Sequence, residues 1–226
     1  MRRGPHPSEG GALSAVWLYA ICRCTGHAPS FSGPAGEHLR LVEAAGLAAV
    51  VGKAIARGAS LPALKRYDAL QRALARQFDA MLPARFGTHI QDETEAAFIL
   101  EARAASLRLA LRRVRGCSQM TLRTVCGTDP LPPAASRASS GASYLRARAS
   151  AAQRDRAMAC FEPVAAAVGR WVSAERFERR GAVASLFQLV PVGATEAYAA
   201  AARQAAEEAR VSVLVTGPYP AYAFAP

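Results

Sequence analysis

The sequence predicts an α+β protein with an N-terminal α/β unit, a ferredoxin-like (βαββαβ) C-terminal domain and an extended C-terminal tail. Strand patterns of period two alternate with helix patterns of period 3.6 along the chain. From Gln119 onward the order of these patterns is β-α-β-β-α-β. Hydrophobic residues make up 51% of the 226 residues, which is enough to bury a core.

We expect four segments. Residues 1–13 hold two prolines and three glycines without periodicity, which is typical of a disordered leader. Residues 14–116 form the N-terminal domain and residues 117–217 the ferredoxin-like domain. Within the latter, residues 127–141 are rich in proline and serine and are predicted to be a flexible loop. Residues 218–226 form an aromatic and proline-rich tail.

The N-terminal domain begins with a strand, Ser14–Cys22, that is apolar on both faces and should therefore be central in its sheet. Two more strands are expected at His38–Glu43 and Leu47–Lys53. Pro62 suits the first turn of a helix that runs to about Asp79. The apolar stripe of this helix consists of Leu64, Tyr67, Leu70, Leu74 and Phe78.

One long helix is predicted over Gln91–Val114. Asp92 and Glu95 in its first turn and arginines in its last turn suit the helix dipole, and Gly116 ends it. Its buried stripe consists of Ala96, Leu100, Ala104, Leu107, Leu111 and Val114.

The C-terminal domain is predicted to have four strands and two helices. In chain order they are a strand at Gln119–Cys126, a helix at Ala142–Trp171, a hairpin of Trp171–Phe177 with Val183–Pro191, a helix at Ala194–Ala209 and a strand at Val211–Thr216. Gly217-Pro218 should end the last strand, because proline has no N–H to donate to the ladder.

The tail that follows carries aromatic residues at Tyr219, Tyr222 and Phe224. Such a segment is too short to form its own core, and in water it would be an exposed apolar patch. We expect it to lie on the body of the protein or against a partner.

The net charge of +11 is concentrated in residues 102–180, which hold 15 arginines against five acidic residues. An arginine-rich surface attracts acidic partners. The arginines expected on outer helix faces are Arg103, Arg108, Arg112, Arg113, Arg146, Arg148, Arg154 and Arg156. Each one alone is best explained as part of a solvated face, but as a group they could dock an acidic surface.

No catalytic or cofactor site is visible in the sequence. It has no phosphate-binding loop and no Gly-x-Ser-x-Gly elbow, and its four histidines are scattered. Asp92 and Glu95 are better explained as helix-capping residues than as a catalytic pair. Cys22-Arg23-Cys24 lacks further metal ligands, so the five cysteines are interpreted as small, reduced apolar residues. We therefore expect a protein that is not an enzyme and has no cofactor or metal.

Arg85 is the one charged residue inside a short apolar segment. It could bind an acidic group of a partner. Internal pairing with Glu93 or Glu95 is the favoured interpretation, because a half-buried charge must be paired.

RNA-recognition domains share the ferredoxin-like topology, but they need exposed aromatic residues on the two central strands. The corresponding strands, Gln119–Cys126 and Val183–Pro191, offer only Phe187. The sequence therefore argues against nucleic acid as the partner.

Two motifs resemble those of a known family. Leu82-Pro83-x-Arg85-Phe86-Gly87-Thr88 resembles the Leu-Pro-x-Arg-Phe-Gly-Thr segment of the gas vesicle protein L/F (GvpL/GvpF) family, and it lies between two predicted helices as it does there. The ending Gly217–Phe224 resembles that family's Gly-Pro-aromatic-Pro-Pro-Tyr-Ser-Phe closing motif. Weaker similarities are found in the first strand, in Leu47–Val51 and in Gly141–Leu145.

The resemblance implies an accessory protein of gas vesicle formation, located in the cytoplasm and at the gas vesicle. Its partners would be the small hydrophobic shell protein (GvpA type) and other accessory proteins, and it would not bind a membrane. It would assist the nucleation and assembly of the shell protein like a chaperone. The residues expected to bind the partner are Arg85, Phe86, Pro218, Tyr219, Tyr222 and Phe224. The alternative is a basic ferredoxin-like binding module for RNA or a small regulatory ligand.

Overall fold

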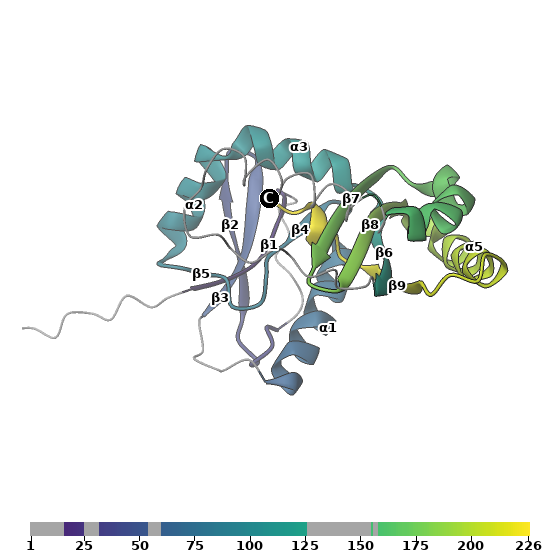
Figure 1. The fold of residues 1–226 in the computed structure, drawn as a ribbon. Helices are drawn as coiled ribbons and strands as arrows, with labels where there is room; N and C mark the ends of the chain where they lie inside the picture. The colour runs from purple at the N-terminus through teal and green to yellow at the C-terminus, as the bar shows by residue number, and fades with distance from the viewer. Residues whose placement is uncertain (1–15, 25–31, 54–59, 126–154, 156–157) are drawn as a thin grey trace, which may run out of the picture. The chain divides into compact units, whose positions relative to one another are not determined.

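The protein is a mixed α+β protein with two antiparallel sheets, which confirms the predicted α+β class. The computed structural model describes residues 16–24, 32–53, 60–125, 155 and 158–226 (Figure 1). The chain divides into two compact units, Met1–Leu111 and Arg112–Pro226, which are described separately below. The predicted leader, the loop at 127–141 and the first part of the helix at 142–171 lie outside the described residues.

The sheet of the first unit has the strand order β2-β3-β1-β4, and β5 also pairs with β1. Its strands are β1 (Val16–Arg23), β2 (Leu39–Ala44), β3 (Leu47–Lys53), β4 (Met81–Pro83) and β5 (His89–Ile90). β1 lies between β3 on one side and β4 with β5 on the other. The apolar pattern on both faces of β1 therefore correctly indicated a central strand.

Helix α1 (Leu61–Gln77) covers one face of this sheet. The Ser60 side chain caps it by accepting from the Ala63 N–H, and Pro62 lies in its first turn. Four of the five predicted stripe residues, from Tyr67 to Phe78, are buried, but Leu64 is 42% exposed. That expectation was wrong because Leu64 lies at the edge of the stripe. The buried face of α1 includes the polar residue Gln71 instead.

The predicted single helix at 91–114 is broken at Arg103 into α2 (Glu93–Ala102) and α3 (Ala104–Val114). Arg103 has φ −110° and ψ 12°, and its carbonyl accepts from both Ser106 Oγ and the Leu107 N–H. This carbonyl begins α3 in the way an N-cap does. No residue in this stretch signals the break, since it needs neither glycine nor proline.

α2 packs on the face of the first sheet that α1 leaves open. Its Ala96 and Leu100 lie with Leu18 and Ala49 around one small apolar cavity. Ala96 and Leu100, the two residues of α2 in the predicted stripe, are buried. So are Leu107, Leu111 and Val114 of α3. Ala104 is only half-buried, because it lies next to the break.

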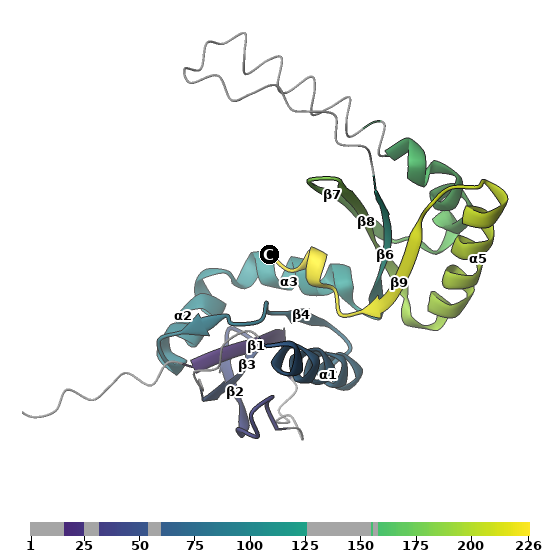
Figure 2. The same cartoon turned by 60° about the horizontal axis from the view of Figure 1, so that its bottom comes forward.

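The second unit has a four-stranded sheet of order β7-β8-β6-β9. Its strands are β6 (Cys117–Val125), β7 (Ala174–Arg180), β8 (Val183–Pro191) and β9 (Leu214–Tyr219). Helix α5 (Thr195–Glu208) and the helical residues 158–168 lie on the same side of this sheet (Figure 2). The core between these helices and the sheet includes Phe161, Val164, Tyr198, Met120, Leu122 and Leu186.

The hairpin differs from the prediction. Gly181, with φ +58°, forms the turn together with Ala182, so β7 extends to Arg180. Trp171 lies before the strand in the 3-10 helix Gly169–Trp171, and it was wrongly placed at the start of the hairpin.

The last strand also differs, because it does not end at Gly217-Pro218. β9 pairs Thr216 with Thr121 and Tyr219 with Gln119, with an irregularity between these pairs. Pro218 is tolerated because β9 is an edge strand. A residue of an edge strand can lack an N–H group without removing a hydrogen bond between strands. Gly217 has φ +125°, and a Cβ there would lie 2.8 Å from the Gln119 carbonyl oxygen, so a glycine is required.

The predicted extended tail is therefore not a separate segment. Its first two residues belong to β9, and Tyr222–Phe224 form a 3-10 helix.

Candidate functional site

Aromatic side chains from three elements meet on one side of the first unit. β1 supplies Trp17 and Tyr19, α1 supplies Tyr67, and the loop after β4 supplies Phe86. The Phe86 ring meets Trp17 edge-on, with centroids 5.4 Å apart, and it meets Tyr67 in the same way at 5.3 Å. Both arrangements are favourable for aromatic quadrupoles. The ring of Phe86 is thus fixed by packing.

The loop that carries Phe86 is a hydrogen-bonded turn over Arg85–Thr88. The Thr88 N–H and Oγ1 both donate to the Arg85 carbonyl, at 3.1 and 2.8 Å. Gly87 has φ +81° at the third position, as a type II turn requires. This geometry explains the glycine of the Arg-Phe-Gly-Thr motif and turns Phe86 toward the body of the unit.

Two hydrogen bonds join this loop to the elements beside it. The Ala84 N–H donates to the Tyr19 carbonyl at 2.8 Å, and the Tyr67 hydroxyl donates to the Ala84 carbonyl at 2.9 Å. The buried Gln71 side chain donates to the same Tyr19 carbonyl at 2.7 Å. The motif is therefore tied to β1 and α1 through its backbone.

Glu37 is a carboxylate held by donors. One of its oxygens accepts from the Tyr19 hydroxyl, and the other accepts from the Ala35 N–H at 2.8 Å. Burial raises the pKa of Tyr19 well above its usual value, and the hydrogen bond to Glu37 raises it further. Tyr19 therefore remains a donor at any physiological pH.

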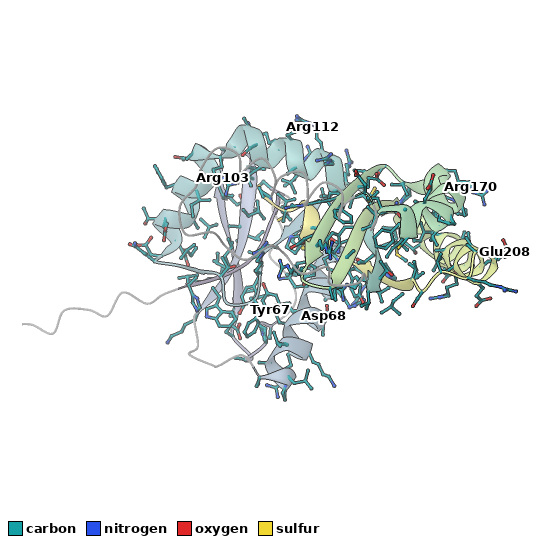
Figure 3. The ribbon with its side chains drawn as sticks, in the orientation of Figure 1. Tyr67, Asp68, Arg103, Arg112, Arg170 and Glu208 are labelled. Atoms are coloured by element: carbon teal, nitrogen blue, oxygen red, sulfur yellow. The ribbon has the colours of Figure 1, made fainter. Side chains whose placement is uncertain are left out.

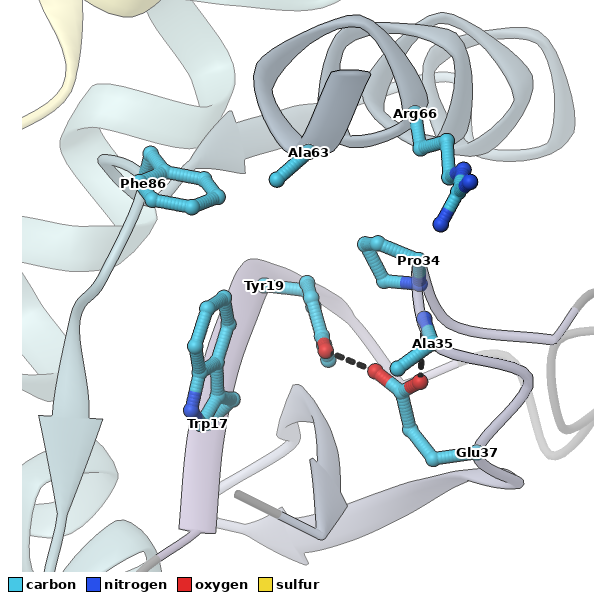
Figure 4. A pocket seen from close by; sticks show the side chains of 8 residues that line it. All are labelled: Trp17, Tyr19, Pro34, Ala35, Glu37, Ala63, Arg66 and Phe86. Atoms are coloured by element: carbon cyan, nitrogen blue, oxygen red, sulfur yellow. Dashed lines mark hydrogen bonds between the residues drawn. The ribbon is translucent and has the colours of Figure 1, made fainter. Parts of the chain in front are cut away.

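Between these groups lies a concave surface that we call the aromatic hollow (Figure 4). Its walls are the rings of Trp17, Tyr19 and Phe86. The rest is formed by Glu37 with its neighbours Pro34 and Ala35, and by Ala63 and Arg66 of α1. It encloses about 360 Å³ together with the solvent at its mouth. Most of this space is open solvent: the cavity itself measures about 20 Å³, room for about one water molecule, so the hollow is a shallow surface feature.

Arg85 does not have the internal partner that the sequence favoured. Its side chain is exposed. Glu93 pairs instead with Arg40 at 2.7 Å, and Glu95 accepts from the Gln91 N–H at 2.5 Å. The pairing prediction was wrong because the turn directs Arg85 to solvent, where no partner is required.

The C-terminal segment, residues 220–226, is held by main-chain contacts within the second unit. The Ala223 N–H donates to Gln119 Oε1 at 2.8 Å, and Arg176 donates to the Ala223 carbonyl at 2.7 Å. Gln119 is buried, and its amide nitrogen donates to Thr121 Oγ1 at 3.3 Å. Neither Gln119 nor Arg176 was identified from the sequence, because the Gln119 contact spans 104 residues.

The predicted partner-binding residues fall into two groups. Arg85 and Phe86 belong to the first unit; Phe86 lines the aromatic hollow and Arg85 does not. The other four belong to the second unit: Pro218 is exposed, and Tyr219, Tyr222 and Phe224 are half-buried. Trp17, Tyr19, Glu37 and Arg66 of the hollow were missed, although the alternating aromatic residues in β1 were a usable signal.

The capping interpretation of Asp92 and Glu95 is confirmed. Asp92 Oδ1 accepts from the Glu95 N–H at 2.8 Å, while Glu95 accepts from Gln91. Cys22 is buried, and its burial raises the pKa of the thiol to about 12, in keeping with an inert apolar residue. In the described part of the chain, no three metal-ligating side chains cluster.

The arginines Arg103, Arg108, Arg112 and Arg113 are exposed as predicted; Figure 3 labels Arg103 and Arg112. The other four of the predicted arginine face, Arg146, Arg148, Arg154 and Arg156, lie outside the described residues. Among the helices that the structure describes, none has the length and apolarity needed to span a membrane.

The sequence matches the family "Gas vesicle synthesis protein GvpL/GvpF" over residues 15–226. The fold is similar to that of the gas vesicle protein GvpF from Anabaena sp. PCC7120, with a TM-score of 0.65, 14% identity and coverage of 94% of this chain and 98% of that one. It is also similar to GvpF from Microcystis aeruginosa, with a TM-score of 0.69, 12% identity and coverage of 94% and 99%. No curated protein matches significantly.

Two antiparallel sheets, each with helices packed on it, thus form an architecture similar to that of the solved GvpF structures. The chain belongs to the GvpL/GvpF family. Membership implies a role in gas vesicle formation and interaction with other gas vesicle proteins, and the family is not known for enzymatic activity.

Proposed function

We propose that this protein binds the small hydrophobic gas vesicle shell protein and assists its nucleation and assembly. The observation that carries the proposal is the family match, which extends over residues 15–226 and therefore over both units. A small apolar subunit exposes surface that aggregates before assembly, and an accessory protein that covers this surface keeps the subunit available.

Two surfaces support this role. In the first unit the aromatic hollow offers apolar walls to a partner, with Phe86 among them. In the second unit Pro218 is exposed, and Tyr219, Tyr222 and Phe224 keep part of their surface in solvent. Aromatic residues are enriched at protein interfaces because they bury a large apolar area at a low entropic cost. The exposed arginines from Arg103 to Arg113 would steer acidic segments of the partner.

The alternative, a basic module that binds RNA, has less support. We infer a ferredoxin-like arrangement for the second unit from its strand order β7-β8-β6-β9 and from the helices on one face. In that arrangement β6 and β8 are the central strands, and Phe187 is their only aromatic residue. RNA-recognition sheets need more stacking platforms than this.

The test is co-expression of this protein with the small shell protein of the same organism. The protein carries an affinity tag, and the shell protein is measured in the captured and in the soluble fractions. The proposal predicts capture together with a larger soluble fraction of shell protein. A tagged, unrelated basic protein serves as the control for binding by charge alone. If the shell protein is neither captured nor solubilised, the proposed function is wrong.

A further inference from the structure

The sheet of the second unit has two edge strands that differ, β9 and β7, which lie at its opposite edges (Figure 2). β9 is irregular where it pairs with β6 and contains Pro218, and both features discourage pairing with a further strand. β7 pairs with β8 over its whole length without a register shift and contains no proline. None of its residues is buried, and among the described strands only β8 pairs with it. Its outer backbone N–H and C=O groups are therefore a template for another strand.

We propose that β7 is a self-association edge, to which a second copy of this chain adds its own β7 in the antiparallel direction. Phe177 of one copy would lie opposite Phe177 of the other copy, and the two four-stranded sheets would join into one. Both copies use the same strand, so the interface is closed by two-fold symmetry and stops at a dimer. Self-association of this kind does not require the shell protein.

The order of charges along β7 favours a second copy as the partner. The strand reads Ala174-Glu-Arg-Phe-Glu-Arg-Arg180, so one Glu-Arg pair lies on each side of Phe177. In the register centred on Phe177, Glu175 of one copy lies opposite Arg179 of the other copy, and Arg176 lies opposite Glu178. Two-fold symmetry repeats each pair, so opposite charges face each other on both sides of the central phenylalanines.

Shifted registers lose this match. A register centred one residue earlier places Arg176 opposite Arg176, and a register centred one residue later places Glu178 opposite Glu178. Like charges directly opposite each other in a sheet are destabilising. Charges on edge strands commonly prevent pairing with other strands. In β7 they oppose the neighbouring registers and match one, so they select both the partner and the register.

The side chains of β7 are divided between the two faces of the sheet. Phe177 is half-buried and packs against the core under the helices. Side chains alternate along a strand, so Glu175 and Arg179 lie on the face of Phe177, while Arg176 and Glu178 lie on the other face. A second Phe177 would cover part of the ring surface that its own core leaves in solvent, and aromatic pairs across strands are favourable.

Contacts within one copy are compatible with these pairs. Arg176 donates to the Ala223 carbonyl at 2.7 Å, but a guanidinium group has five N–H donors. Glu178 accepts from Arg180 at 2.6 Å through one oxygen, and a carboxylate accepts bonds at both oxygens. That ion pair is exposed to solvent, so rearranging it costs little.

The interface is small, because each copy contributes one strand of seven residues. We therefore expect a weak dimer with a dissociation constant of about 10–100 µM. Each copy carries a net charge of +11, which opposes association. At about 150 mM salt this repulsion is screened beyond about 8 Å, whereas charges in direct contact are screened less.

Charge reversal tests the pairing in the full-length chain. Glu175→Arg and Arg179→Glu each place like charges opposite each other twice in a dimer. In sedimentation experiments from about 5 to 500 µM, we expect either variant alone to dimerise at least about tenfold more weakly than the wild type. An equimolar mixture restores opposite charges in the heterodimer and should dimerise like the wild type. Glu207→Arg and Arg203→Glu, exposed on α5, make the same changes in net charge and should leave dimerisation unchanged.

Three results would overturn the proposal: a wild type that stays monomeric throughout this range, variants that dimerise as well as the wild type, or a mixture that dimerises no better than its components. The mixture also controls for folding, because a misfolded variant cannot be rescued by its counterpart. Circular dichroism of each variant is the independent check.

A cysteine at the centre of β7 tests the register without reversing a charge. Position 177 lies opposite itself, so Phe177→Cys places two thiols within the range of a disulfide. In Glu175→Cys the two Cα atoms would be about 14 Å apart, which is too far. After mild oxidation we expect at least about fivefold more disulfide-linked dimer for Phe177→Cys than for Glu175→Cys or for the wild type with its five cysteines. Equal amounts in all three proteins would overturn the proposed register.

Discussion

The aromatic hollow and the C-terminal segment use similar residues in different ways. In the hollow, Phe86 is held by ring contacts and lines an open concave surface. In the C-terminal segment, Gln119 and Arg176 bond to the two backbone polar groups of Ala223. An aromatic-rich motif therefore does not reveal from its composition whether it anchors the chain or forms a contact surface.

The largest expected effect is at Gly217, which lies within β9, shortly before the C-terminal segment. In Gly217→Ala the new Cβ would lie 2.8 Å from the Gln119 carbonyl oxygen, at a φ of +125°. We expect the free energy of unfolding of the second unit to fall by about 2–3 kcal/mol. Urea denaturation followed by Trp171 fluorescence measures it. Gly169→Ala, whose Cβ would have no neighbour within 4 Å, is the control.

Trp17 fluorescence sharpens this comparison. If the two units unfold independently, Gly217→Ala leaves the unfolding midpoint seen by Trp17 unchanged. An equal destabilisation by Gly169→Ala would contradict the packing argument.

The next largest effect is at Gln119, which bonds to Ala223 and Thr121. Gln119→Leu keeps the side-chain volume but leaves the Ala223 N–H without its acceptor. We expect a loss of about 1–3 kcal/mol and faster hydrogen exchange at the Ala223 amide. The control is Gln204→Leu, because Gln204 is exposed on α5. Unchanged exchange at Ala223 would show that Gln119 does not hold the C-terminal segment.

Alkaline pH should weaken both units. Burial raises the pKa of Tyr19 in the first unit and of Tyr198 in the second. Because each folded-state pKa lies above the unfolded value of about 10, this stability is fully present below pH 10 and is lost as the pH rises beyond it. Cys22, with its pKa raised to about 12, adds a loss that begins near pH 9.

Replacing one tyrosine at a time assigns these losses. Tyr19→Phe should flatten the decline of the first unit above pH 10, and Tyr198→Phe that of the second. Urea midpoints measured from pH 7 to pH 11 with each tryptophan as reporter give the result. A decline that is the same in both variants and the wild type would contradict the assignment.

The smallest expected effect is at the Arg40–Glu93 pair, which joins β2 to α2. Its side chains are 53% and 45% exposed, so solvent screens their attraction. Arg40→Gln should cost only about 0.2–1 kcal/mol, and less in high salt. Thermal unfolding at two salt concentrations is the measurement. A loss above about 2 kcal/mol would mean that the pair is more important than its exposure indicates.

Regular patterns could be predicted from the sequence. The two-sided apolar pattern of β1 indicated a central strand, and the stripe of α1 was correct except at Leu64. The two motifs, Leu82–Thr88 and Gly217–Phe224, indicated the family, and the match over residues 15–226 confirms it.

Details that depend on distant contacts could not be predicted. The break at Arg103 involves ordinary helix-forming residues, so local propensity contains no signal of it. The continuation of β9 through Pro218 depends on its edge position, which the sequence does not state. In the hollow, Phe86 was identified from its motif, but Glu37 and Arg66 are brought to it only by the fold.

The central claim is that this protein keeps the shell protein available for assembly. The most direct test is to dilute denatured shell protein into buffer with this protein or with an unrelated basic protein of similar size, and to follow aggregation by light scattering. The account predicts that this protein suppresses the scattering at a fixed molar ratio, while the unrelated protein does not. Equal suppression by both proteins, or by neither, would contradict it.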